Sequence, residues 1–173
     1  MAGRAPRIGQ LPAPRHGGSR GRFAVVAGRF NEPVSKKLVD GAVAALTAHG
    51  VAGPDLEVHW VPGSFELGQA AHALAVTRRF AAIVCVGVVI KGATPHFDYV
   101  CGAAAQGITH AALATGVPIS FGVITALTEE QAWERAGGAV GNRGEEAALA
   151  AVEMAEFVRN TKGSRAASRS KAK

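Results

Sequence analysis

Four short hydrophobic segments predict strands, and segments of helical periodicity alternate with them. Two of the four, 23–27 (FAVVA) and 82–90 (AIVCVGVVI), are nearly free of polar residues, as is typical of strands buried on both faces of a parallel sheet. The other two lie at 56–61 and 117–124. The segment 82–90 is the most hydrophobic, which favours a central place in the sheet.

Between these strands, apolar residues recur with the period of a helix and follow typical helix-start residues. Pro33 suits the first turn of one helix, Ser64 is placed to cap the next, and Thr94 with Pro95 marks the start of a long one. We therefore expect helices at 33–50, 64–79, 94–114, 128–137 and 142–159, the last two opened by capping boxes. Strands that alternate with helices predict an α/β fold with a parallel sheet and helices on both faces.

Charge is unevenly distributed, and the net charge of +6 reflects the two ends of the chain. Residues 1–22 and 160–173 each hold five basic residues and no acidic one, which leaves −4 for 23–159. Both ends are rich in small residues and Pro and lack apolar periodicity, so we interpret them as disordered tails around one domain at 23–159. Such tails are usually just solvated. Contact with nucleic acid or anionic cargo is the alternative, weakened because no aromatic residue interleaves the basic ones.

The composition argues against several classes of protein. The sequence has no apolar run of transmembrane length and no apolar signal segment at its start, so we expect neither a membrane protein nor an exported one. The two cysteines, Cys85 and Cys101, lack the spacing of a disulfide framework or a zinc site and suit a reducing cytoplasm. No histidine metal motif, GxxxxGK[ST] or GxGxxG after a strand is present.

The segment 91–99 (KGATPHFDY) carries the strongest chemical signal, because it joins the most hydrophobic strand to the start of a helix. Free backbone N–H groups and the helix dipole favour an anion at such a position. Gly92 allows a ligand to approach the backbone, and the Thr94 hydroxyl can donate to a phosphate oxygen. The helix field disfavours a charged imidazole at His96, so we expect His96 to accept a proton near neutral pH. The other histidines have no such setting, and we expect them to be structural or exposed.

Further candidates follow the first two strands or lie in a later helix. Phe30 could stack on a planar ring or belong to the core. Residues 64–66 could offer backbone N–H groups, and Glu66 could accept hydrogen bonds from ligand hydroxyls or merely favour the first turn of its helix. Arg135 is a candidate phosphate clamp, because guanidinium can grip phosphate with two donors, and Arg143 is a weaker one. Either arginine could instead be a solvated surface charge.

Taken together, several motifs resemble the 6,7-dimethyl-8-ribityllumazine synthase family over about residues 23–157. They are GRFNEPVSKKLVDGA, VPGSFEL, GVVIKGATPHFDYVC, FGVIT, EEQAWERAG and GNRGEEAALAAVEM, in order and with nearly ungapped spacing. The resemblance implies a flavodoxin-like three-layer α/β/α sandwich with a central four-stranded parallel sheet. It also implies the penultimate step of riboflavin biosynthesis, in which 5-amino-6-(D-ribitylamino)uracil condenses with 3,4-dihydroxy-2-butanone 4-phosphate and releases phosphate and water. It implies neither a metal nor an organic cofactor.

The resemblance also implies roles for particular residues. Phe30 would stack on the pyrimidine, His96 would transfer protons, and Phe121 and Arg135 would reach the site from an adjacent subunit, with Arg135 on the phosphate. The remaining matched positions are Ser64, Phe65 and Glu66 for the ribityl chain and ring, Val88, Val89 and Ile90 for the pyrimidine, and Ala93 and Thr94 for the phosphate. Lys91 departs from the family, which usually has arginine there.

The resemblance implies a ring of five subunits with the sites between neighbours. Some members stop at the homopentamer and others build an icosahedral shell. The short link at 137–141 resembles shell-forming members, so we expect a shell, with riboflavin synthase as a further partner. A catalytically silent shell or a flavin-binding protein on the same scaffold is the alternative, and the intact set of candidate site residues argues against it.

Overall fold

The computed structural model describes residues 21–51 and 53–170, with side chains described as far as residue 161. Its central element is a four-stranded sheet formed by β1 (Arg22–Gly28), β2 (Leu56–Val61), β3 (Phe80–Ile90) and β4 (Ile119–Ala126). All neighbouring strands are parallel, and the order β2-β1-β3-β4 is that of a flavodoxin-like sheet. The predicted α/β fold with a parallel four-stranded sheet is therefore confirmed.

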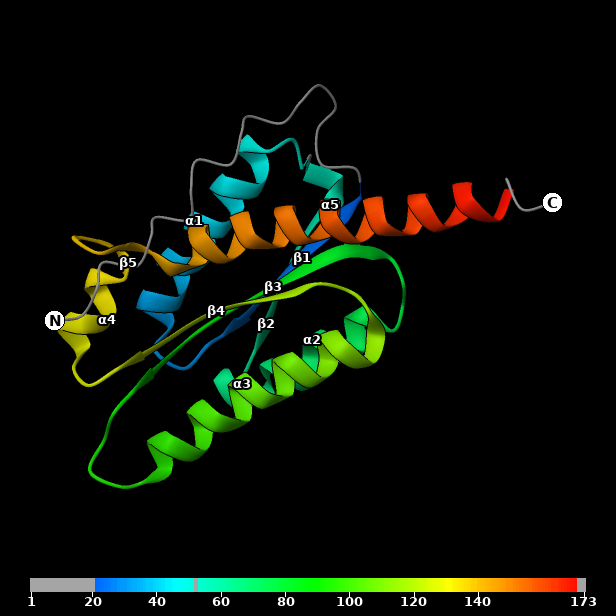
Figure 1. The fold of residues 1–173 in the computed structure, drawn as a ribbon. Coiled ribbons are helices and arrows are strands. Elements are labelled where there is room, and N and C mark those ends of the chain that lie inside the picture. The colour runs from blue at the N-terminus through cyan, green and yellow to red at the C-terminus, as the bar shows by residue number, and fades with distance from the viewer. Residues whose placement is uncertain (1–20, 52, 171–173) are drawn as a thin grey trace, which may run out of the picture.

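Helices cover both faces of this sheet (Figure 1). They are α1 (Glu32–Ala48), α2 (Leu67–Ala75), α3 (His96–Thr115), α4 (Glu129–Glu134) and α5 (Arg143–Ser170). Two single 3₁₀ turns, η1 (Gly53–Asp55) and η2 (Ser64–Glu66), flank β2, and a short antiparallel ribbon of β5 (Ala136–Gly138) and β6 (Gly141–Asn142) joins α4 to α5.

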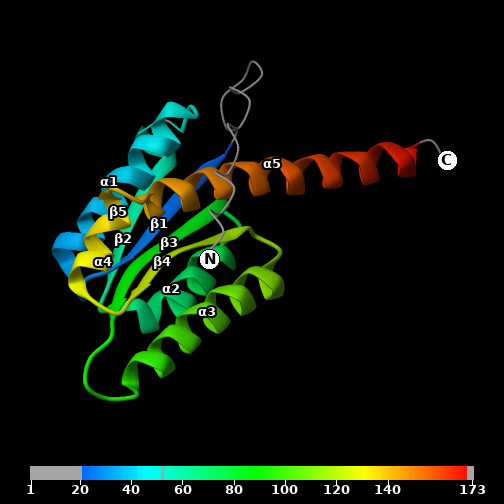
Figure 2. The same ribbon diagram turned by 60° about the vertical axis from the view of Figure 1, so that its left-hand side comes forward.

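The sheet divides the core into two layers. Val25 and Val84 pack with α1 and α5 on one face, whereas Val26 and Cys85 pack with α2 and α3 on the other. Successive strand residues alternate between these two clusters, and both clusters are apolar. This explains why the segments at 23–27 and 82–90 lack polar residues, and Figure 2 shows the resulting three layers.

Two helix starts differ from the sequence prediction. Ser64 does not cap α2, because it opens the turn η2 and its buried hydroxyl makes no hydrogen bond within the described residues. Helix α3 begins at His96 and not at Thr94, since Pro95 holds the cap position without a side-chain hydrogen bond. The caps of the last two helices are as predicted: Thr128 accepts a hydrogen bond from the Gln131 N–H, and Asn142 accepts from the Gly144 and Glu145 N–H groups.

Two helix ends also differ. Helix α2 ends at Ala75 and not near residue 79, because the chain turns through a left-handed backbone at Arg78, with φ of 58°. Helix α5 was expected to end near residue 159 but continues to Ser170, projecting from the body of the protein (Figure 2). Ala, Lys and Arg are favourable helix residues, so α5 can continue into the segment that we expected to be a disordered tail. Residues 1–20 and 171–173 of the two expected tails lie outside the described residues.

Candidate active site

A cavity of about 420 Å³ lies at the carboxyl ends of β1, β2 and β3. The strand order reverses between β1 and β3, and ligands of such sheets bind at this switch point. The walls of the cavity come from the segments that directly follow these strands. They are Phe30, the run Pro62, Gly63, Ser64, Phe65 and Glu66, the strand end Val88, Val89 and Ile90, then Gly92 and Thr94, and finally His96, Phe97 and Val100 of α3.

Phe30 stands at the mouth of the cavity with its side chain largely uncovered. It is 73% exposed, although it is a large apolar residue, so the alternative of a core phenylalanine is wrong. Its backbone is nevertheless fixed, since the Phe30 N–H donates to the Pro62 carbonyl at 3.0 Å and the Arg29 N–H to the Val61 carbonyl at 2.8 Å. A fixed, exposed aromatic face is suited to stack on a planar ligand.

The segment after β2 supplies polar groups without partners in the described chain. Ser64 is 4% exposed, and its hydroxyl makes no hydrogen bond there. Glu66 is half-buried, and its carboxylate lies beside Gly63, where a Cβ would stand 3.4 Å from Oε2. Phe65 is 60% exposed. A buried hydroxyl and a partly buried carboxylate next to aromatic rings can bind a ligand that carries both hydroxyl groups and a ring.

The segment 91–98 forms an open wall at the start of α3. Gly92 and Thr94 line the cavity, and no atom lies within 4 Å of a Cβ built on Gly92, so the backbone is accessible. Ala93 is exposed and does not line the cavity. The His96 side chain is exposed and lines the cavity. The free N–H groups of the first turn of α3 therefore lie beside an imidazole, an arrangement suited to hold an anion while a proton moves.

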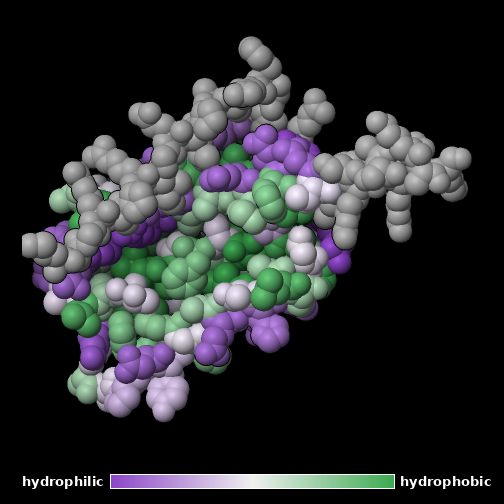
Figure 3. Space-filling model, viewed as in Figure 1, coloured by the Kyte–Doolittle hydropathy of each residue, from purple (hydrophilic) through white to green (hydrophobic). Residues whose placement is uncertain are grey.

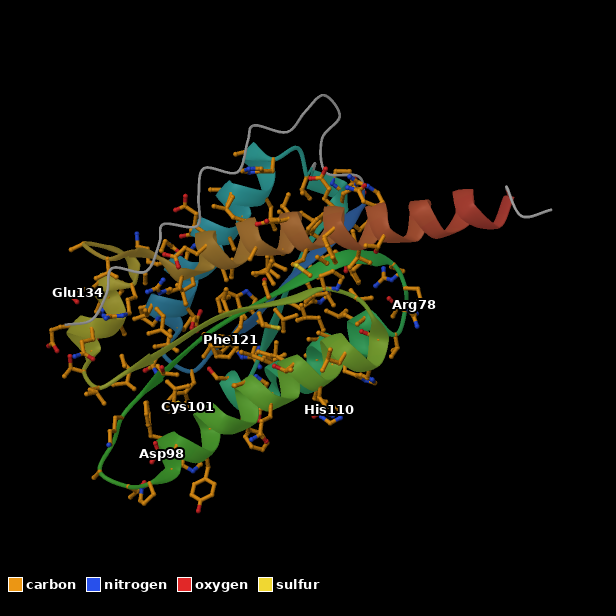
Figure 4. The ribbon with its side chains drawn as sticks, viewed as in Figure 1. Arg78, Asp98, Cys101, His110, Phe121 and Glu134 are labelled. Atoms are coloured by element: carbon orange, nitrogen blue, oxygen red, sulfur yellow. The ribbon has the colours of Figure 1, made fainter. Side chains whose placement is uncertain are left out.

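The thiols next to this wall are poor nucleophiles. Burial raises the pKa of Cys85 to about 12, and this residue lies inside β3. Burial, and to a lesser extent the negative charge of Asp98, raises the pKa of Cys101. Figure 4 places Asp98 and Cys101 on the first turns of α3. Neither thiol is a credible covalent catalyst, because thiolate is the reactive form.

Phe121 and Arg135 are not brought to this cavity within one chain. Phe121 lies on β4 and is 45% exposed, in the middle of an apolar face between α5 and α3 (Figures 3 and 4). Arg135 follows α4, donates to the Gln131 carbonyl at 3.0 Å and lies 3.5 Å from the Glu134 carboxylate. Arg143 is paired with Glu146. Neither of the two matched residues lines the cavity in the single chain.

Some cavity residues were absent from our set of candidates. Pro62 and Gly63 belong to a motif that drew attention to the turn after β2, and their strand-end position was the available signal. Phe97 and Val100 were missed because apolar helix residues usually signal core packing. Both accompany His96 on the side of α3 that faces the cavity.

The described residues contain neither a membrane-spanning helix nor a cluster of metal-binding side chains. Within 21–51 and 53–170, no helix has the length and apolar character needed to cross a membrane. In the same residues, no three side chains of His, Cys, Asp or Glu come together as a potential metal site.

Comparison with known proteins gives the family of the chain. Residues 20–159 match the family described as 6,7-dimethyl-8-ribityllumazine synthase. The chain is also 51% identical, over 138 residues, to the 6,7-dimethyl-8-ribityllumazine synthase of Syntrophus aciditrophicus (strain SB). That alignment covers 80% of this chain and 90% of the relative.

Proposed function

The chain belongs to the 6,7-dimethyl-8-ribityllumazine synthase family, and from this premise we propose that its strand-end cavity catalyses the lumazine-forming step of riboflavin biosynthesis. In this transferase reaction, 5-amino-6-(D-ribitylamino)uracil condenses with 3,4-dihydroxy-2-butanone 4-phosphate to give 6,7-dimethyl-8-ribityllumazine, phosphate and water. The observation that carries the proposal is the convergence of Phe30, Glu66, Thr94 and His96 on one cavity from separate segments of the chain.

The pyrimidine would lie between Phe30 and the end of β3. The exposed ring of Phe30 would stack on it, and Val88, Val89 and Ile90 would form the opposite, mostly apolar wall. The ribityl chain would extend along 64–66, where the unpartnered Ser64 hydroxyl and the Glu66 carboxylate meet its hydroxyl groups. Ligand hydroxyls would then satisfy the polar groups that the described residues leave unbonded.

The phosphorylated ketone would place its phosphate where α3 begins. Ala93 and Thr94 would hold the phosphate on backbone N–H groups and the Thr94 hydroxyl, with the helix dipole favouring the anion. The amine of the first substrate attacks the ketone and a first water leaves as the imine forms. Phosphate is then eliminated, and ring closure releases a second water. His96 would transfer protons in these steps, and this transfer would accelerate the reaction by about 10²- to 10⁴-fold. Orientation of the two bound reactants would supply much of the remaining rate acceleration.

A neighbouring subunit would complete the site. Neither Phe121 nor Arg135 lines the cavity of its own chain, so each would act on the cavity of another copy. The apolar face around Phe121 is the kind of surface that a subunit contact buries (Figure 3). We therefore place the active site between subunits of a homopentamer, with Arg135 of one copy on the phosphate bound by the next.

The proposal extends to the larger assembly and its setting. The link between α4 and α5 is only the short ribbon of β5 and β6, and on this basis we favour an icosahedral shell of pentamers, with riboflavin synthase as a partner. The free thiols of Cys85 and Cys101 fit a cytoplasmic location.

The test is a direct assay with both substrates. Purified protein should produce lumazine, followed by its absorbance or fluorescence, together with one phosphate per product. Absence of product at every protein concentration would refute the proposed activity. Binding of ribityl ligands without turnover would instead support a catalytically silent flavin-binding protein.

A further inference from the structure

The turn between β1 and α1 is held to its surroundings at several points. The Phe30 N–H is bonded to Pro62, and the Phe30 carbonyl accepts from the hydroxyl of the fully buried Ser35 at 3.5 Å. The neighbouring Asn31 adds a contact in a different direction: its Nδ2 donates to the Val88 carbonyl at 3.3 Å. The turn that presents Phe30 is thus tied both to the loop after β2 and to β3.

The backbone of Asn31 is unusual. It has φ of 62° and ψ of 42°, the left-handed region, and Arg78 is the one other non-glycine residue with positive φ in the described chain. Asparagine is among the few side chains that adopt this conformation readily. The Asn31 carbonyl then accepts from the N–H groups of Val34 and Ser35, both at 3.1 Å, so the same residue turns the chain and starts α1.

The carbonyl that Asn31 binds lies where the sheet no longer connects β1 with β3. The ladder between these strands ends at the pair Ala27 and Val86, and Val88 lies beyond it, in the cavity wall. The Asn31 amide therefore joins the two walls of the cavity past the end of the ladder. These walls are the Phe30 ring and the strand end 88–90.

We propose that Asn31 is a positioning residue that fixes the spacing between the Phe30 ring and the end of β3, and thereby the slot for the planar pyrimidine. This inference rests on the proposed function, because it assumes that the pyrimidine binds between these walls. Asn31 acts through Phe30 and Val88 and needs no contact with the substrate. It governs binding of the pyrimidine substrate and leaves the phosphate end of the cavity unaffected.

The test uses two replacements that tolerate the left-handed backbone. Asn31→Gly removes the amide, and Asn31→Asp replaces the donor with a carboxylate facing the Val88 carbonyl. Loss of one neutral hydrogen bond corresponds to about a three- to tenfold loss of affinity. The KM for ribitylaminouracil should therefore rise by that factor in the glycine variant. In the aspartate variant it should rise at least as much. The KM for the butanone phosphate should change less than about twofold, as expected for a separate subsite.

Arg78→Gly is the matched control. Arg78 has the same backbone conformation, and its side chain also donates to a carbonyl, that of Thr115 at 2.7 Å. It precedes β3 at the opposite end of the strand from the cavity (Figure 4). Arg78→Gly should lower the melting temperature without changing either KM.

The outcomes separate this inference from the function on which it rests. If the wild-type protein forms lumazine and both Asn31 variants keep the wild-type KM for ribitylaminouracil, the positioning role is overturned and the function stands. Equal rises in both KM values, or a loss of melting temperature alone, would likewise overturn it, because a merely structural role predicts those results. If the wild-type protein forms no lumazine, both proposals fail.

Discussion

The hydroxyl oxygen of Ser64 lies only 2.5 Å from the position that a Cβ atom on Gly87 would occupy. Gly87 belongs to β3, and Ser64 belongs to the turn after β2 that lines the cavity. The missing side chain at Gly87 thus leaves the space in which the Ser64 hydroxyl sits. The shape of the cavity depends on a glycine that does not itself line it.

We predict that Gly87→Ala displaces Ser64 and impairs both folding and binding. Overpacking of this kind costs about 1–3 kcal/mol, and the KM for ribitylaminouracil should rise because the hydroxyl moves. Urea unfolding and steady-state kinetics measure the two effects. Adding Ser64→Ala should recover part of the lost stability, since it removes the clashing oxygen.

Gly102→Ala is the control: nothing lies within 4 Å of its Cβ position, so it should be neutral or stabilising by up to about 1 kcal/mol. Equal losses in the two glycine variants would contradict the packing argument.

Replacement of His96 should affect turnover and leave folding intact. The side chain is exposed, so His96→Ala should keep the melting temperature within about 2 °C, as is usual for surface substitutions. Loss of a proton-transfer group should lower kcat by about 10²- to 10⁴-fold. His110→Ala, an exposed histidine further along α3, is the matched control and should retain wild-type kcat. Wild-type turnover in His96→Ala would remove the assignment of His96 as the base.

Replacement of Arg135 should discriminate between the two substrates. A charge-assisted pair with phosphate contributes about 1.5–3 kcal/mol, so Arg135→Ala should raise the KM for the butanone phosphate by about 10- to 100-fold. The KM for ribitylaminouracil should stay near the wild-type value. Arg159→Ala, which removes an exposed arginine of α5, should change neither constant. Equal losses toward both substrates in Arg135→Ala would count against a phosphate clamp.

The thiol at position 85 should be inert in the folded protein. With a pKa of about 12, only about one Cys85 in 10⁴ is a thiolate at pH 8. Iodoacetamide at this pH should therefore leave Cys85 unmodified and activity intact, whereas unfolding in urea should expose it to complete alkylation. Peptide mass spectrometry measures the alkylation of Cys85 in the folded and the unfolded protein. An adduct on Cys85 in the folded enzyme would show that the strand opens more readily than its burial implies.

The sequence predicted the sheet well because its signal is repetitive. Hydrophobic segments such as 82–90 can be buried on both faces only in the middle of an α/β sheet, and the alternation with helices then sets the topology. The starts of α2 and α3 were less predictable. Ser64 and Thr94 are both good capping residues by type. In the folded chain, however, Ser64 lies in the turn η2, and α3 begins at His96 with Pro95 at its cap position.

The cavity was predictable in part. Turns that follow strands in a parallel sheet meet at one edge, so Phe30, Glu66 and Thr94 could be expected together. The left-handed turn at Asn31 and its bond to Val88 could not, because the bond joins distant segments and leaves no periodic trace in the sequence. Guanidinium chemistry made Arg135 a candidate phosphate clamp, but the sequence pattern did not indicate that Arg135 lies outside the cavity of its own chain.

Mixing two impaired variants is the most direct test of the shared site. His96→Ala and Arg135→Ala subunits are unfolded, mixed in equal amounts and reassembled. If His96 and Arg135 of one site come from different subunits, about a quarter of the sites in a random mixture contain both native residues. In an assay at a butanone phosphate concentration well below the wild-type KM, we predict that activity returns to about a quarter of the wild-type value, whereas each variant reassembled alone keeps at most about a tenth of it. Activity that stays at the level of the separate variants would contradict a site built between two chains.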